Sequence, residues 1–293
     1  PVSAVMSGVM IKTGIYGIVR TLVLLGDVPV WCAWLVLGMG AVSGVLGVLF
    51  ALAQRDLKRL LAYSSVENIG IIALGIGLGM LGTAYGVPAV AALGFAGGLL
   101  HVLNHAMFKG LLFLGAGSVV HAAGTRNIER LGGLFKRMPW TGTAFLAGSI
   151  AICGLPPFNG FAGEFLIYLG SFKTLLAAGP VALGGLVAVV ALALIGGLAA
   201  ACFTRAFGIA FLGEPRSADA VHAHEADISM RGPMFALGAI CLVIGLGASA
   251  VVRIMEPAVA MLSGSAAAIS ESRPIQWLFP IACGAALLLL LAW

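Results

Sequence analysis

The chain alternates between long apolar stretches and short polar segments. Several of the apolar stretches reach the length of about 20 residues that a helix needs to cross a bilayer. These stretches are residues 3–24, 30–53, 60–81, 90–119, 181–211, 233–254 and 275–293. The pattern therefore predicts an all-α fold, a polytopic transmembrane helical bundle.

A further apolar stretch, residues 139–177, is interrupted by the sequence LPPFNG at residues 155–160. Pro156 and Pro157 each lack a backbone N–H, so a helix does not continue through them undisturbed. In lipid, the carbonyl groups that lose their partners must find others in the protein or in a polar cavity. Together with Gly160, the two prolines predict either two short spans or one discontinuous helix. Discontinuous helices mark ion sites in transporters.

Charged residues make up only 9% of the chain, with 16 Lys and Arg and 11 Asp and Glu, whereas hydrophobic residues make up 61%. A soluble domain contains roughly 25% charged residues, so this chain has too few to cover a soluble surface. The composition excludes an ordinary soluble enzyme, a disordered chain, a nucleic-acid binder and a disulfide-stapled secreted module. The net charge of +5 comes from basic residues scattered over loops, and we expect the lipid bilayer, not nucleic acid, as the partner.

The cysteines give no sign of metal or redox chemistry. They are isolated in apolar stretches, with no C-x-x-C pair and no Cys/His pair at the spacing of metal ligands. Isolated buried thiols behave as small hydrophobic residues. We therefore expect no cofactor, no metal site and no catalytic residue in this chain. The cysteines are Cys32, Cys153, Cys202, Cys241 and Cys283.

Ionisable residues at membrane depth are candidates for function, because a charge inside a bilayer is costly. Lys12 lies in the middle of the first span among small residues, where it either exchanges protons or pairs with a carboxylate for structure alone. His101, His105 and Lys109 follow the spacing i, i+4, i+8, which places them on one helical face. Such a stripe forms a proton relay, since charging one group disfavours charging the next.

Two carboxylates and a basic segment complete the candidates. Glu164 follows the Pro-Pro break, where it either carries protons or stabilises a helix N-terminus through the helix dipole. Lys58 belongs to residues 56–59 (DLKR), which also fit a simple positive-inside anchor. Glu67 follows in the next span and pairs either with that segment or with another helix.

Taken together, these motifs resemble those of one family. Residues 54–65 (QRDLKRLLAYSS), 101–109 (HVLNHAMFK) and 154–165 (GLPPFNGFAGEF) are similar to signature segments of the antiporter-like, proton-pumping membrane subunits of respiratory complex I. The same family includes subunits of Mrp-type antiporters and of the formate hydrogenlyase and hydrogenase-4 complexes. Residues 64–70 and 158–164 most resemble the branch of hydrogenase-4 component B and formate hydrogenlyase subunit 3.

The resemblance implies a fold built on two inverted repeats of helices, of which this chain holds the last helix of the first repeat and all of the second. Because the chain begins at Pro1 rather than Met, we expect a C-terminal fragment of a longer protein. Residues 1–255 then form an antiporter-like proton-conducting transmembrane domain that is N-terminally truncated. Residues 256–293 form a linker and an additional C-terminal transmembrane helix.

The resemblance also implies roles for the ionisable residues. Lys12 matches the central lysine that links two half-channels, and the histidine-lysine stripe matches the relay that connects to it. Glu164 matches the terminal proton-carrying residue on the discontinuous helix. The expected proton relay therefore consists of Lys12, Lys58, His101, His105, Lys109 and Glu164.

The functional prediction is a proton-translocating membrane subunit of an energy-converting oxidoreductase complex, of the hydrogenase-4/formate hydrogenlyase or NADH-quinone oxidoreductase kind. We expect it in the bacterial inner membrane, with the side rich in Lys and Arg in the cytoplasm. Its expected partners are other membrane subunits and a peripheral redox arm of hydrogenase or dehydrogenase subunits, which carry the redox chemistry. A Mrp-type Na⁺/H⁺ antiporter subunit is the first alternative, because the same motifs serve both. A structural membrane anchor with silent ionisable groups is the second.

Overall fold

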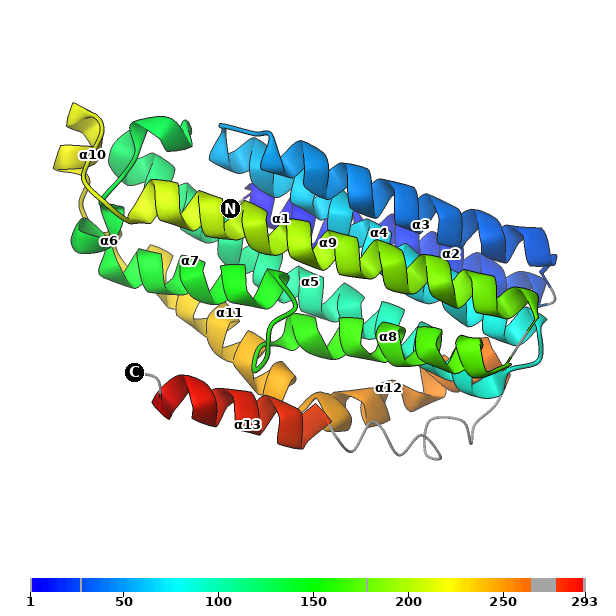
Figure 1. Cartoon of the computed structure of the whole chain (residues 1–293). Coiled ribbons are helices and arrows are strands. Elements are labelled where there is room, and N and C mark those ends of the chain that lie inside the picture. Colours follow the sequence, from blue (N-terminus) through cyan, green and yellow to red (C-terminus); the bar gives the residue numbers. More distant parts are fainter. Residues whose placement is uncertain (1, 27, 178, 265–277, 292–293) are drawn as a thin grey trace.

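The computed structural model describes residues 2–26, 28–177, 179–264 and 278–291, which form helices joined by short loops (Figure 1). Within these residues, six helical spans are long and apolar enough to cross a membrane, which confirms the predicted polytopic all-α bundle. The helices that build these spans are α1 (Val2–Val5), η1 (Met6–Met10), α2 (Lys12–Leu25), α3 (Val30–Leu52), α4 (Leu57–Ala84), α5 (Pro88–Ala123), α9 (Pro180–Phe211) and α11 (Ile228–Leu246).

The predicted helix break separates α7 (Pro139–Ile152) from α8 (Asn159–Ala177). The two helices follow one another along the same line, with a loop between them (Figure 1). Of the two alternatives, the structure therefore shows one discontinuous helix and not two separate crossings. Pro156 and Pro157 lie in the connecting loop, as expected for residues that cannot donate a helical hydrogen bond.

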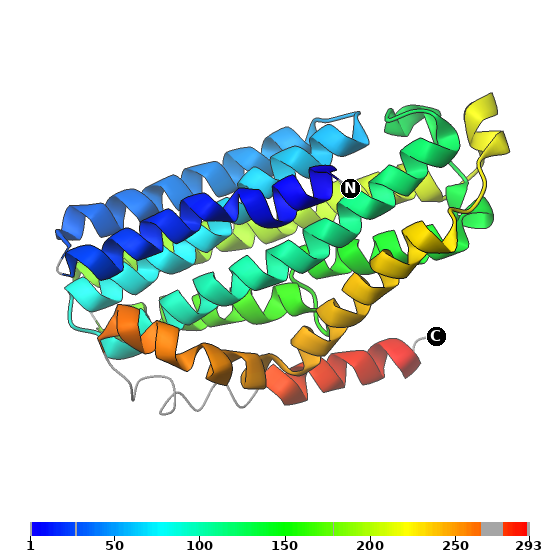
Figure 2. The same cartoon turned by 180° about the vertical axis from the view of Figure 1, so that it is seen from behind.

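The predicted single span at residues 233–254 differs from the structure. Helix α11 ends at Leu246, and α12 (Ala248–Ser263) continues in another direction (Figure 2). The physical reason lies at Gly245, which passes so close to the helix break that a Cβ there would overlap the carbonyl oxygen of Pro157. The bend after α11 therefore packs directly against the break between α7 and α8.

The last predicted span, residues 275–293, falls partly on α13 (Leu278–Leu291). Residues 275–277 and 292–293 lie outside the described residues.

Helix α4 is held tightly between α3 and α5. In a bilayer, close approach of helix backbones replaces the hydrophobic effect as the source of packing energy, and small residues permit it. A Cβ on Gly47 of α3 would lie 2.5 Å from the backbone nitrogen of Glu67 in α4. A Cβ on Gly75 of α4 would lie 2.8 Å from the Cα of Gly98 in α5. These contacts bury the middle of α4 on two sides.

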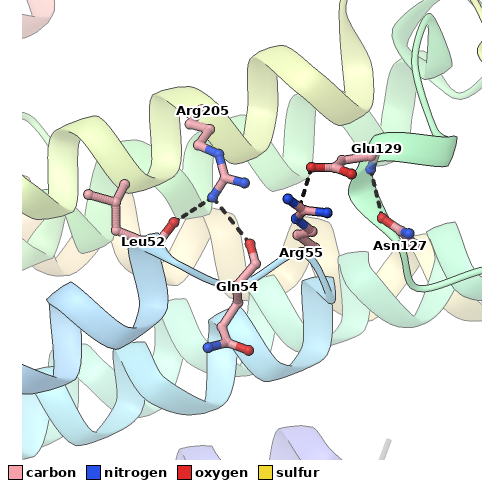
Figure 3. A network of polar contacts seen from close by, with 6 residues as sticks. All are labelled: Leu52, Gln54, Arg55, Asn127, Glu129 and Arg205. Carbon is pink, nitrogen blue, oxygen red and sulfur yellow. Dashed lines mark hydrogen bonds and ion pairs between the residues drawn. The ribbon is translucent and has the colours of Figure 1, made fainter.

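The segments that follow α3, α5 and α9 carry most of the basic residues and lie at one end of the bundle (Figure 1). A network of polar contacts joins them there (Figure 3). Arg205 of α9 donates hydrogen bonds to the carbonyl oxygens of Leu52 and Gln54, at 2.5 and 3.2 Å. Arg55 forms an ion pair with Glu129 of the short helix η2 (Ile128–Arg130) at 3.2 Å. These contacts fix α9 and the start of α4 to the loop after α5.

A second ion pair lies at the same end of the bundle. Lys136 of α6 (Leu134–Arg137) donates to a Glu214 carboxylate oxygen at 2.6 Å, and this bond holds the pKa of Glu214 below its ordinary value. Both side chains are largely exposed, at 69% and 78%, so the pair contributes little to stability.

Candidate functional site

Four buried polar residues interrupt the apolar sequence of α4: Ser64, Ser65, Glu67 and Asn68. Three of them bond within their own helix, and Ser64 Oγ does so by donating to the carbonyl oxygen of Leu61 at 3.2 Å. Ser65 Oγ donates to the carbonyl oxygen of Leu61 at 2.9 Å, and Asn68 Nδ2 donates to the carbonyl oxygen of Ser64 at 2.8 Å. Bonds to the preceding turn allow such residues to remain in a helix. The polar stretch therefore keeps α4 helical while supplying acceptors to its neighbours.

Lys109 of α5 is fully buried and bound to this stretch. Its Nζ donates to the carbonyl oxygen of Leu61 at 2.9 Å and to Ser64 Oγ at 2.5 Å. A buried ammonium without hydrogen-bond partners is strongly destabilising, and these two acceptors reduce that cost. The contact also places a proton donor directly against a hydroxyl group, which can pass a proton on.

His101 lies two helical turns before Lys109 on α5 and joins α4 to α8. Its Nε2 is 3.0 Å from Asn68 Oδ1, and because Asn68 Nδ2 is already a donor, the histidine nitrogen donates this bond. The other ring nitrogen, Nδ1, has no hydrogen-bond partner among the described residues. It lies 3.0 Å from the position of a Cβ on Gly163, so it faces α8 beside Glu164.

His105 lies between these two residues and is equally buried. Neither of its ring nitrogens has a hydrogen-bond partner in the described part of the chain. The edge of its ring packs on Phe108, with 5.5 Å between the ring centroids. The predicted stripe of His101, His105 and Lys109 is therefore present as three buried side chains on α5.

Lys12 enters the same polar region from the first span. It follows the π-helix η1 directly, and its side chain is only 8% exposed. Lys12 Nζ donates to the carbonyl oxygen of Ser7 at 2.5 Å, and Ser7 Oγ lies 2.7 Å from Ser65 Oγ. Ser65 and Lys109 both donate to the same carbonyl oxygen, that of Leu61. A series of hydrogen-bonded residues thus connects Lys12 with Lys109, in which the carbonyl oxygens of Ser7 and Leu61 only accept.

Glu164 lies on α8 with its carboxylate turned back towards the helix break. A Cβ on Gly154 would lie 2.5 Å from Glu164 Oε2. Gly154 has a φ of 64°, a conformation that L-residues rarely adopt. Glycine is therefore required at position 154 for two reasons. It permits the positive φ of the turn, and it leaves space for the carboxylate of Glu164.

Two asparagines fasten the break to α5. Asn104 Nδ2 donates to the carbonyl oxygen of Asn159 at 2.7 Å, and Asn159 Nδ2 donates to the carbonyl oxygen of Asn104 at 3.3 Å. Both residues are fully buried. This reciprocal pair joins the first residue of α8 to the middle of α5, and it fixes the start of α8 at the level of Asn104.

Replacing Asn104 or Asn159 by alanine is expected to lower the free energy of unfolding by about 1 kcal/mol, because each change removes one buried hydrogen bond between α5 and α8. Since both bonds hold the same two helices, the double variant is expected to lose less than the sum, with a coupling of about 0.5 kcal/mol or more. Unfolding of the detergent-solubilised full-length protein measures all three. Ser43→Ala, which removes a bond within α3 alone, serves as the control. If the losses of unfolding free energy in the two single variants simply add up in the double variant, the two asparagines do not act as a pair.

Lys58 lies apart from the other predicted residues. It occupies the first turn of α4, half-buried, where Asp56 caps the helix by accepting from the backbone N–H groups of Lys58 and Arg59 at 2.8 and 2.9 Å. Within residues 2–26, 28–177, 179–264 and 278–291, no group of three His, Cys, Asp or Glu residues is placed to hold a metal ion.

The fold and the buried ionisable residues define an antiporter-like membrane subunit: a bundle of transmembrane helices with one discontinuous helix. The family described as NADH:quinone oxidoreductase/Mrp antiporter, TM, matches residues 1–192. The chain belongs to this family.

Two curated relatives and one solved structure are similar to this chain over most of its length. Hydrogenase-4 component B of Escherichia coli (strain K12) is 47% identical over 251 residues, which cover 84% of this chain and 37% of that protein. Formate hydrogenlyase subunit 3 of the same organism is 43% identical over 285 residues, 97% of this chain and 46% of that protein. The chain thus spans less than half the length of these relatives. A subunit in the structure of the Mrp complex from Dietzia sp. DQ12-45-1b shares the fold, with a TM-score of 0.72 at 24% identity over 94% of this chain and 55% of that one.

Proposed function

We propose that this chain conducts protons as the antiporter-like membrane subunit of an energy-converting oxidoreductase complex of the hydrogenase-4 or formate hydrogenlyase type. The observation that carries the proposal is the buried hydrogen-bonded series from Lys12 through Ser7 and Ser65 to Lys109. Buried lysines cost stability, so a bundle that served only as an anchor would gain nothing from two of them in one connected polar region.

Like-charge repulsion gives the relay its direction. A proton that charges Lys12 disfavours the charged form of Lys109, because both lie in a low-dielectric interior where charges act over long distances. The proton on Lys109 is then driven through the buried polar region around His105 and His101 towards the carboxylate of Glu164. Lys58, half-buried at the start of α4, is the proposed point of exchange with the aqueous phase at the basic end.

The redox chemistry belongs to partners in this proposal. The chain supplies the proton path, residues 1–255, and other membrane subunits with a peripheral hydrogenase or dehydrogenase arm supply the electrons. The complex is proposed to lie in the bacterial inner membrane, with the basic end of the bundle in the cytoplasm. High identity to hydrogenase-4 component B and to formate hydrogenlyase subunit 3 supports this assignment over the other members of the family.

The proposal is tested in inside-out membrane vesicles that contain the full-length gene product. Hydrogen or formate, with an electron acceptor, should acidify the vesicle interior, and the acidification should not require Na⁺. The alternative, a Mrp-type Na⁺/H⁺ antiporter subunit, is favoured by the shared fold with the Dietzia Mrp complex. It predicts the opposite: added Na⁺ releases a preformed pH gradient, and neither hydrogen nor formate builds one.

A further inference from the structure

The proton relay described above does not include the buried carboxylate of Glu67. Glu67 of α4 is 0% exposed, and neither of its carboxylate oxygens has a hydrogen-bond partner among the described residues. Every other buried polar group on this part of α4 has a hydrogen bond. A carboxyl group kept at membrane depth in this way is by default a candidate for function.

The register of α4 against α5 gives the depth of Glu67 in the membrane. Lys109 contacts Leu61 and Ser64, and His101 contacts Asn68. The two helices run in opposite directions, so Glu67 lies at a depth between those of Lys109 and His101. On another side of α4, Gly47 of α3 packs closely against the backbone of Glu67. That side of Glu67 is therefore covered by α3.

Four titratable groups on other parts of the bundle lie within electrostatic range of the Glu67 carboxylate. The ammonium of Lys109 on α5 and the carboxylate of Glu164 on α8 both act on it. Its own charge acts on Cys153, at the start of the break, and on Cys202 of α9. Glu67 is therefore within electrostatic range both of Lys109, at the end of the histidine-lysine stripe, and of Glu164, on the discontinuous helix.

We propose that Glu67 is a further proton-carrying residue, which accepts a proton from Lys109 and passes it to Glu164. The inference rests on the proton-conducting function proposed above. In the first step the Lys109 ammonium gives a proton to the Glu67 carboxylate, which leaves a neutral amine and a neutral carboxylic acid. In the second step the acid gives that proton to the Glu164 carboxylate, and the Glu67 carboxylate is restored.

Charge conservation favours this path over the histidines for the first step. Transfer of a proton from a charged Lys109 to a charged Glu67 neutralises both groups, so the net charge of the two residues stays zero. Transfer from Lys109 to a neutral His105 moves a full positive charge to a residue that has no hydrogen-bond partner in the described chain. Moving an unpaired charge through a low-dielectric interior is the costlier step.

The test compares Glu67→Gln and Glu67→Asp in the full-length protein within its assembled complex. Glu67→Gln is expected to lower redox-driven proton translocation about tenfold or more, whereas Glu67→Asp keeps a carboxyl group and restores most of it. Glu129→Gln is the matched control, since Glu129 lies on the surface in an ion pair with Arg55 and its loss should leave translocation unchanged. The amount of assembled complex is measured for each variant.

A second measurement does not depend on translocation. Infrared difference spectra of the protein between two pH values should contain a carboxylic-acid C=O band that is lost in Glu67→Gln and displaced in Lys109→Met. The titratable groups that act on this band are those named above: Lys109, Glu164, Cys153 and Cys202.

The outcomes separate this inference from the proposed function. If Lys109→Met stops translocation while Glu67→Gln translocates at the wild-type rate, the function stands and the role of Glu67 is overturned. If neither variant changes translocation, the proposed function fails. In that case, if Glu67→Gln keeps the carboxylic-acid C=O band, Glu67 does not take up protons and the inference fails as well. If the band is lost, Glu67 takes up protons for another process.

Discussion

Replacing Lys109 by methionine is expected to lower the rate of proton translocation about a hundredfold or more. The side chain is fully buried and donates to two groups of α4, the Leu61 carbonyl and the Ser64 hydroxyl. Methionine has a similar length and fills the same space, so packing changes little. What is lost is the buried ammonium through which α5 joins the hydrogen-bonded series that begins at Lys12.

The charge of Lys109 and its ability to release a proton are separated by a second variant, Lys109→Arg. Arginine keeps the positive charge but does not release a proton in proteins. If Lys109 served only to balance buried carboxylates, Lys109→Arg would preserve much of the activity. We expect it to fail nearly as completely as Lys109→Met.

Both variants are measured as redox-driven acidification of inside-out vesicles, together with the electron-transfer rate of the complex. Electron transfer is expected to continue in part, because the redox groups lie in other subunits. Lys136→Met is the matched control, since Lys136 is 69% exposed and pairs only with Glu214 at the surface. Full translocation by Lys109→Met would exclude the proposed path.

The sequence predicts the helices well because the relevant signals are local. Apolar length predicts the spans, and Pro156 and Pro157 predict the interruption from their own missing N–H groups. The spacing of His101, His105 and Lys109 places all three on one face of any helix. Each of these inferences needs only a few neighbouring residues.

The remaining features depend on residues far apart in the chain. Nothing in the sequence around Ser7 or Ser65 indicates that they are in contact with each other. Their hydroxyl groups meet only because η1 packs next to α4. The asparagine pair joins Asn104 of α5 with Asn159 of α8, which are 55 residues apart in the sequence. The bend at the end of α11 packs against Pro157. Gly245 and Gly247 are a local signal for a helix end, but the contact with the break depends on residues about 90 positions away. Polar residues in mid-span, at Ser7 and Asn104, are the one sequence signal for these contacts.

Replacing Gly160 by valine is expected to disrupt the discontinuous helix, with a loss of stability of about 3 kcal/mol or more. A Cβ at this position would overlap the carbonyl oxygen of Ala151, the last turn of α7. Backbone, unlike the end of a flexible side chain, cannot turn aside, so α7 and α8 must move apart. The expected result is a strong decrease in the amount of protein in the membrane and a lower melting temperature in detergent.

Gly197→Val on α9 is the control, because nothing lies within 4 Å of a Cβ built there. Both variants add the same β-branched side chain to a helix at membrane depth, so the difference in melting temperature isolates the contact with α7. Equal stability of the two variants would contradict the close approach at the break.

The same substitution tests whether the break positions the proton path. Separating α7 from α8 shifts the carboxylate of Glu164 away from Gly154, and it displaces the Asn159 contact with α5. The smaller change Gly160→Ala should therefore fold better than Gly160→Val, yet still translocate protons more slowly than wild type per assembled complex. If Gly160→Ala instead lowered only the amount of protein and left the rate per complex unchanged, the break would be needed for folding alone, and proton transfer would not depend on its geometry.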